Sequence, residues 1–210
     1  MKPSSISCRV LVIAAMMLTW FAASAGARTL VISDGQDEYQ AASFVQVLLD
    51  PTEKMTLAQA VTAQKEKKFL PNNQDRLSMG TVQGALWLFM EIKLPSDHPQ
   101  DPMILELSRE SIEQVDVYFP DPDGTLQHIP AGYHLKPGQM TVFSRYPAVR
   151  LPGGHHKDPL PVFIRLKSPF ALGMGITIRT REAFHRHHLA ESYLFGLLYG
   201  VPLALSLFNF

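Results

Sequence analysis

The chain has 210 residues, 46% of them hydrophobic, and its 19 basic and 19 acidic side chains give a formal net charge of zero. This balance provides no electrostatic basis for binding nucleic acid or a strongly acidic ligand. The single cysteine, Cys8, lies in the N-terminal apolar segment, so the rest of the chain has no disulfide and must be stabilised by packing.

Residues 1–27 have the composition of a secretory signal peptide. Lys2 and Arg9 precede an apolar run over 10–22, and small residues follow at 23–27. A charged start, a short apolar run and small residues are the order found in cleaved export signals. We therefore predict export, with a mature chain that begins at Gly26 or Arg28. An uncleaved anchor is the alternative, but the run is short for a membrane span.

The C-terminal segment 189–210 is predicted to be a transmembrane helix. It carries no charged side chain from Ser192 to its end. Its length approaches the ~20 residues that a bilayer core requires. We expect this helix to be the first span of a longer membrane protein, of which 28–184 forms an exported domain.

The region between these segments is predicted to form short strands. Apolar and polar residues alternate in several runs, and turn signals such as Asp121-Pro122-Asp123-Gly124 separate them. Thr56 and Gln59 have the spacing of a capping box, which predicts a helix from Leu57 to about Gln64. The predicted strands cover 44–49, 85–94, 103–108, 114–119, 125–129, 139–144, 162–167 and 173–180, with 77–84 as a loop or short strand.

About eight strands with one short helix and no disulfide predict an all-β fold, a jelly-roll β-sandwich. One face of each strand is needed for the core, and the other faces carry aromatic and charged residues together. Aromatic rings with neighbouring polar groups suit a sugar, because the apolar face of a pyranose stacks on a ring while polar groups bind its hydroxyls. We predict Trp87, Tyr118 and Arg165 as ligand-binding residues. The competing interpretation is that Trp87 and Phe89 pack under the N-terminal segment or the loop after Met55.

The order of these elements resembles the periplasmic sensory domain, extracellular type 2, of bacterial seven-transmembrane receptors with diverse intracellular signalling modules. The resemblance covers about 28–210. The residues that carry it are the strand ending in Val47-Leu48-Leu49-Asp50-Pro51, the Leu86-Trp87-Leu88 strand, Val115-Asp116-Val117-Tyr118, Val162-Phe163-Ile164-Arg165-Leu166, and the junction from Tyr193 through Tyr199-Gly200 to Asn209.

This resemblance implies a jelly roll similar to carbohydrate-binding modules. It implies that residues 28–188 lie in the periplasm, held at the inner membrane by the first helix of a seven-helix unit. It also implies a cytoplasmic output domain in the same full-length chain, often a diguanylate cyclase or histidine kinase. The expected function is ligand sensing and signal transmission, and the expected partners are a small molecule such as a sugar and the lipid bilayer.

The histidines are not predicted to bind metal. His155 and His156 lie in a loop rich in glycine and proline, while His185, His187 and His188 lie beside the predicted membrane helix. Adjacent histidines on an extended chain point apart, whereas zinc needs three or four converging ligands. A response to pH at His187 or His188 is the better hypothesis for the second group, because imidazole titrates near neutrality.

The sequence favours no enzyme within this segment, and no cofactor is expected. No Gly-x-Ser-x-Gly elbow and no glycine-rich phosphate loop occurs in it. Two alternatives to a sensor stay open: a membrane-tethered carbohydrate-binding module without a signalling role, and a periplasmic hydrolase with two catalytic carboxylates.

Overall fold

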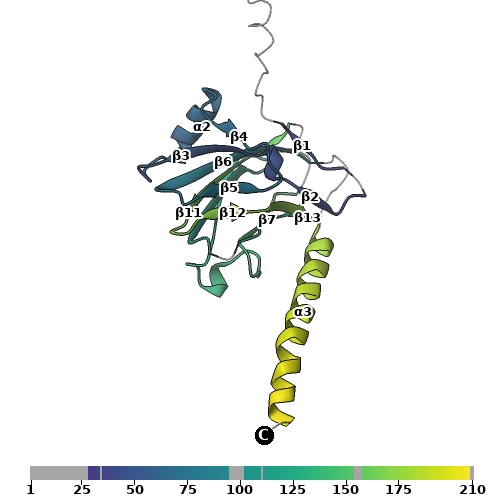
Figure 1. Ribbon diagram of the computed structural model, residues 1–210. Helices are drawn as coiled ribbons and strands as arrows, with labels where there is room; N and C mark the ends of the chain where they lie inside the picture. Colours follow the sequence, from purple (N-terminus) through teal and green to yellow (C-terminus); the bar gives the residue numbers. More distant parts are fainter. Residues whose placement is uncertain (1–27, 34, 95–101, 110, 154–157, 209–210) are drawn as a thin grey trace, which may run out of the picture.

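The computed structural model describes residues 28–33, 35–94, 102–109, 111–153 and 158–208, and the predicted signal peptide lies outside these ranges. Within them the chain forms a β-sandwich, with α2 (Leu57–Lys65) on one side and α3 (Arg181–Phe208) leaving from the opposite side (Figure 1). The predicted sandwich with one short α-helix and a C-terminal apolar helix is therefore confirmed. The jelly-roll connectivity stays a prediction.

The larger sheet has the strand order β4-β3-β6-β11-β8-β9. These neighbours are antiparallel, whereas β1 runs parallel to the end of β6. The strands of this sheet are β1 (Leu30–Val31), β3 (Gln46–Asp50), β4 (Leu70–Pro71), β6 (Ala85–Lys93), β8 (Gln114–Pro120), β9 (Leu126–Ala131) and β11 (Leu160–Lys167).

The smaller sheet has the order β10-β7-β13-β2, and a separate pair joins β12 to β5. Short 3₁₀ turns, η2 (Ala42–Phe44) and η3 (Pro137–Gln139), lie in the connections. The strands of these two sheets are β2 (Glu38–Gln40), β5 (Leu77–Gly80), β7 (Ile104–Leu107), β10 (Ala148–Arg150), β12 (Leu172–Met174) and β13 (Ile176–Arg179).

The core lies between the two sheets and is built from alternate residues of the central strands. Leu88, Met90 and Ile92 of β6 are fully buried there, and Leu105 and Ile178 belong to the same apolar cluster from the smaller sheet. The inward faces predicted for β6, β8 and β11 are confirmed, because a period of two places every second side chain on one face of a strand.

The outer face of the large sheet is partly covered by α2. Thr56 and Gln59 form the predicted capping box, so the helix begins where the sequence indicates. Ala60 and Ala63 of α2 are buried in a cluster with Trp87 and Phe89, whose side chains point outward from β6. As a result β6 is buried on both faces, which explains why apolar residues occupy its outer face as well.

The strand predicted over 139–144 is wrong, because this segment is η3 followed by irregular chain. Gln139 Oε1 accepts a hydrogen bond from Lys136 N, and Ser144 Oγ accepts one from Tyr146 N. Such local side-chain bonds satisfy backbone donors that a strand would direct to a neighbour.

The strand predicted over 173–180 is divided at Gly175 into β12 and β13. The Ser108 hydroxyl accepts a hydrogen bond from Gly175 N at 3.0 Å and donates one to Gly175 O at 3.1 Å. The backbone N of Ser108 also donates to Gly175 O at 3.0 Å. The chain changes sheets at this residue, so β12 pairs with β5 while β13 continues in the smaller sheet. The short-strand option for 77–84 is correct. The strands of two or three residues at β1, β2, β4 and β10 were not predicted.

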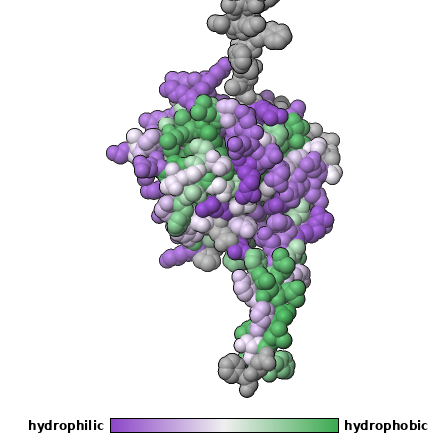
Figure 2. All heavy atoms as spheres, in the orientation of Figure 1, coloured by the Kyte–Doolittle hydropathy of each residue, from purple (hydrophilic) through white to green (hydrophobic). Residues whose placement is uncertain are grey.

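The predicted membrane helix is the continuation of a longer one. α3 begins at Arg181, inside the range predicted for the sandwich, and runs without a break past Pro202 to Phe208. It is long and apolar enough to cross a membrane, and none of its most apolar window is buried. Figure 2 shows apolar surface along this helix below a mostly polar sandwich.

We predict that Leu88→Ala lowers the free energy of unfolding by about 2–5 kcal/mol, because it leaves a cavity in the core. Leu88 is 0% exposed, whereas Leu70 is 67% exposed. Leu70→Ala is the matched control and should change stability by less than about 0.5 kcal/mol. Denaturant unfolding followed by circular dichroism measures both; equal effects would contradict this account of the core.

Candidate functional site

Three stacked rings lie across the outer face of the large sheet. Trp87 of β6 and Tyr118 of β8 have ring centroids 6.0 Å apart, with an angle of 22° between their planes. Tyr118 and His128 of β9 lie 4.6 Å apart at 11°. We call Trp87, Tyr118 and His128 the aromatic row. The row exists because β8 and β9 pair in a register that places Tyr118 opposite His128.

The Asp116 carboxylate connects the aromatic row to neighbouring polar groups. Its Oδ1 lies 2.9 Å from His128 Nε2, and its Oδ2 accepts a hydrogen bond of 2.8 Å from Gln114 Nε2. Arg165 Nη1 lies 3.6 Å from the same Oδ2. A cross-strand arrangement of acid, base and amide groups next to rings can hydrogen-bond the hydroxyls of a polar ligand.

The cluster also joins the sheet to the loop before α2. Arg165 Nη2 donates a hydrogen bond to Glu53 O at 3.0 Å. Lys167 Nζ lies 2.6 Å from Glu53 Oε2, and this hydrogen bond raises the pKa of the lysine. Burial and the nearby Asp116 charge raise the pKa of the Tyr118 phenol. Tyr118 therefore keeps its proton at neutral pH and can both donate and accept a hydrogen bond.

The three residues predicted as a ligand site are brought together by strand register, because Arg165 pairs with Trp87 on one side and with Asp116 on the other. Trp87 is only 1% exposed, so the prediction that it is covered is confirmed, and no open ring face is left on it for a ligand. The cover is α2 together with Met55 before it, and, among the residues that the structure describes, the N-terminal segment takes no part in this cluster. The half-buried Tyr118 and Arg165 remain at the edge of this cover. Their role in binding stays a prediction.

The sequence prediction missed His128, whose side chain is 49% exposed and ends the aromatic row. Its position in a strand after the Asp121–Gly124 turn was the available signal, because a two-stranded hairpin fixes which residues face each other. Thr125 N donates to Asp123 Oδ1 in this turn, which confirms that Asp123 has a structural role there.

A second polar network lies on the outer face of the smaller sheet. Arg179 of β13 is 5% exposed and Glu106 of β7 is 1% exposed, and their Nη1 and Oε1 atoms are 3.2 Å apart. Arg179 Nε also lies 3.0 Å from Glu38 Oε2. Glu106 Oε2 then contacts Nε2 of His188 on α3 at 3.0 Å. We call Glu38, Arg179, Glu106 and His188 the junction network.

The first turns of α3 are held to the sandwich by packing as well. Phe184 is 2% exposed and belongs to a cluster with Ile104, Val142 and Ala148. Ala183 N donates to Thr180 Oγ1 at 3.2 Å, which satisfies a donor at the start of the helix. Because charge pairs and packing act on the same turns, α3 is fixed to the small sheet before its apolar part begins.

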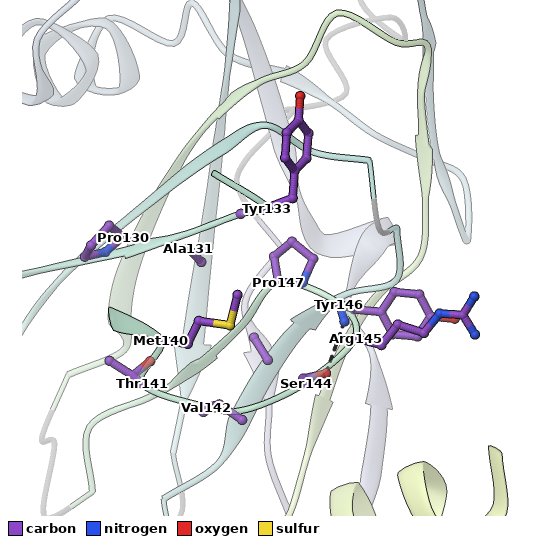
Figure 3. A pocket seen from close by; sticks show the side chains of 12 residues that line it. Pro130, Ala131, Tyr133, Met140, Thr141, Val142, Ser144, Arg145, Tyr146 and Pro147 are labelled. Carbon is purple, nitrogen blue, oxygen red and sulfur yellow. Dashed lines mark hydrogen bonds between the residues drawn. The ribbon is translucent and has the colours of Figure 1, made fainter. Parts of the chain in front are cut away.

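A small cavity lies on the same side of the sandwich as α3. It has a volume of about 170 Å³ and is formed by the end of β9, the connection 132–147 and the start of β10. Figure 3 shows the Arg145 side chain extending away from this cavity and the hydrogen bond from Tyr146 N to Ser144 Oγ. Ser144 Oγ also lies 3.3 Å from His188 Nε2. The connection therefore touches both the cavity and α3.

The histidines do not form a metal centre among the residues that the structure describes, where no group of three His, Cys, Asp or Glu side chains converges. His155 and His156 lie outside the described residues. His187 and His188 both contact Glu191 of α3, with closest distances of 3.4 Å and 3.9 Å. His188 also contacts Glu106 of the small sheet, so it lies in the junction between domain and helix.

The family model described as 7TMR-DISM extracellular 2 matches residues 42–180 of this chain. The match begins before β3 and ends at the residue before α3, so it covers nearly the whole sandwich. No curated protein matches the chain.

We predict that lowering the pH destabilises the junction through Glu38. The hydrogen bond from Arg179 lowers the pKa of Glu38 below its ordinary 4.5. A carboxylate with a depressed pKa in the folded state contributes stability above its unfolded pKa and loses it as pH falls through the folded value. The melting temperature should therefore fall as pH drops below 4.5.

The variant Glu38→Gln tests the source of this pH dependence. Its melting temperature should lie below that of the parent at neutral pH and approach it in acid, so the difference narrows as pH falls. Asp75→Asn, at an exposed turn, serves as the control and should keep the parent profile. A constant difference between Glu38→Gln and parent at all pH values would refute the role of this carboxylate.

Proposed function

We propose, from the premise that the chain belongs to the 7TMR-DISM extracellular 2 family of receptor sensory domains, that its sandwich senses a small molecule outside the cytoplasm. We infer that the ligand is a carbohydrate and that α3 is the first helix of a seven-helix unit in a bacterial inner membrane. The signal then passes to a cytoplasmic output domain of the same full-length chain. This segment has no catalytic role, cofactor or nucleic-acid partner in the proposal.

The junction network is the observation that carries this proposal. A sandwich that only holds a ligand near a membrane requires no fixed orientation, whereas here a single residue, Thr180, separates the end of β13 at Arg179 from the start of α3. Arg179 and Glu106 are buried, and His188 joins them from the helix. Moving α3 relative to the sheet breaks charged contacts in a low-dielectric place, which favours a small number of discrete arrangements.

The ligand site in this proposal is the open half of the outer large-sheet face. His128 offers an exposed ring, and the Tyr118 phenol offers a hydrogen-bond donor and acceptor. Arg165 and Asp116 are the charged side chains next to these two rings. A sugar ring stacked beside His128 would reach these polar groups. Trp87, first predicted to contact the ligand, instead holds Tyr118 in place, since its ring packs against Tyr118 from the covered side.

A continuous segment connects this face to α3. His128 lies in β9, which leads directly into the connection 132–147, and Ser144 in that connection contacts His188 of α3. A ligand that binds one arrangement of β9 more tightly than another shifts the equilibrium between arrangements of the sandwich and α3. The size of the shift equals the difference in binding free energy. The tethered-module and hydrolase alternatives assign no role to this route.

We predict that carbohydrate binding changes the fluorescence of Trp87, the one tryptophan outside residues 1–27. Titration of the chain in detergent with a panel of mono- and oligosaccharides should show saturable changes in emission. His128→Ala should weaken the affinity of the responding sugar about tenfold, because it removes the ring on which the sugar stacks and a hydrogen bond worth roughly 0.5–1.5 kcal/mol, and about 1.4 kcal/mol corresponds to a factor of ten.

The matched control is His185→Ala, which removes an exposed histidine on α3, remote from the aromatic row. It should leave the affinity unchanged. If no saccharide gives a saturable response, the ligand class is wrong. If the His128 and His185 variants bind equally well, the site is wrong.

We also predict that a Gly-Ser insert after His185 separates ligand binding from output. Two added residues rotate the following part of a helix by about 200°, so His188 can no longer face Glu106. Ligand affinity should remain, while the ligand-dependent output of the full-length receptor is lost. The same insert after Asp75, in an exposed turn, is the control and should preserve both. Normal output with the His185 insert would count against the junction as the route.

A further inference from the structure

The connection 132–147 is held against α3 at the level where that helix loses its charges. Ser144 contacts His188, and the Arg145 guanidinium lies 4.6 Å from the ring centroid of Phe195. These two contacts bracket Glu191, the last charged residue of α3, and Ser192, after which every side chain is uncharged. The bracketed part of the helix is about 10 Å long at a rise of 1.5 Å per residue.

Phe143 is the exposed residue of this connection. It is 85% exposed, more than any other large hydrophobic side chain that the structure describes outside α3. Its neighbours in sequence are anchored, since Val142 is buried with Phe184 and Ser144 contacts α3. The backbone therefore presents the ring outward in a fixed place. A phenyl ring held in water forgoes the free energy that burial of its surface provides.

The position of Phe143 indicates what covers it. Phe143 and Arg145 line a hollow with Glu191, Ser192 and Phe195 of α3. If α3 enters a bilayer at Ser192, this hollow lies in the interfacial layer, which is about 5–8 Å thick on each side of the hydrocarbon core. The connection hangs from the α3 side of the sandwich, opposite α2, so it faces the same membrane surface (Figure 1).

The side chains around Phe143 also have the composition of an interfacial belt. Tyr193 is 75% exposed on α3, directly after Ser192, and Tyr146 and Arg145 lie on the connection. Aromatic rings and basic groups concentrate at the headgroup level of membranes, where an apolar body and a polar end are both satisfied. A guanidinium at this level is also suited to lipid phosphates.

We propose that the segment 142–146 is a second membrane contact of this domain, with Phe143 inserted among lipid headgroups and Arg145 at the level of their phosphates. The inference rests on the proposed function in one respect, namely that α3 crosses the bilayer. Together the helix and this segment fix the height and tilt of the sandwich. A change in the connection 132–147 then moves the sandwich against the membrane as well as against α3.

The test uses the whole chain in vesicles of phosphatidylethanolamine and phosphatidylglycerol, with Cys8→Ser as background. A polarity-sensitive fluorophore is attached to Phe143→Cys, to Leu70→Cys or to Tyr199→Cys. Leu70 is the matched control, because it is 67% exposed on β4, beside α2 on the side opposite α3 (Figure 1). Two quenchers are compared: iodide in the water, and a lipid that carries a nitroxide near its headgroup.

We expect the label at 143 to emit at shorter wavelength than the label at 70, to be quenched by the nitroxide lipid, and to resist iodide several-fold better. Equal iodide quenching at 143 and 70 overturns the proposal. Protection from iodide at 143 without quenching by the lipid also overturns it, because a protein surface then covers the ring. The label at 199 tests separately the premise that α3 crosses the bilayer. Lipid quenching at 199 but not at 143 refutes only the membrane contact of segment 142–146. Lipid quenching at neither site refutes the membrane role of α3 as well.

Discussion

The placement of the sandwich on its helix depends on one buried cation. Arg179 ends β13, lies between Glu106 and Glu38, and precedes α3 by a single residue. Burying this guanidinium costs desolvation free energy, so the buried ion pair of Arg179 and Glu106 is poor evidence for added stability. Its effect is on geometry: Glu106 contacts Arg179 and His188 together in this relative position of sheet and helix, and a shift of the helix breaks the contact with His188. The buried charge thus converts a covalent connection into a defined orientation.

The two outer faces of the sandwich have different surroundings as a consequence. The small sheet faces the base of α3 and the connection 132–147, whereas the large sheet faces away and is only partly covered by α2 (Figure 1). The open part of that distant face carries His128 and Tyr118, with Asp116 buried beside them. This separation suits a sensor, because the proposed ligand site and the apolar helix lie on opposite faces, while β9 and the connection after it join them.

Much of the fold was predictable because it follows from local rules. The alternation of β6, the capping box at Thr56 and the Asp121–Gly124 turn each depend on residues close in sequence, and each is confirmed. The strand predicted over 139–144 failed because Gln139 and Ser144 bind nearby backbone donors, and because Val142 packs with Phe184, which lies far along the chain. The aromatic row was only partly predicted, since the partner of Tyr118 depends on the pairing of β8 with β9 and the exposure of Trp87 depends on α2.

Composition and hydrophobic periodicity define the class of the molecule: a sandwich of alternating strands without cysteine, followed by an apolar helix, with the family resemblance borne out over residues 42–180. Tertiary structure decided which residues meet. It placed Trp87 under a helix, joined His128 to Asp116, and buried Glu106 beside Arg179 and His188. The physical reason is that hydrophobic periodicity specifies a face within one element, whereas the partner of a charge is set by long-range packing that no local pattern records.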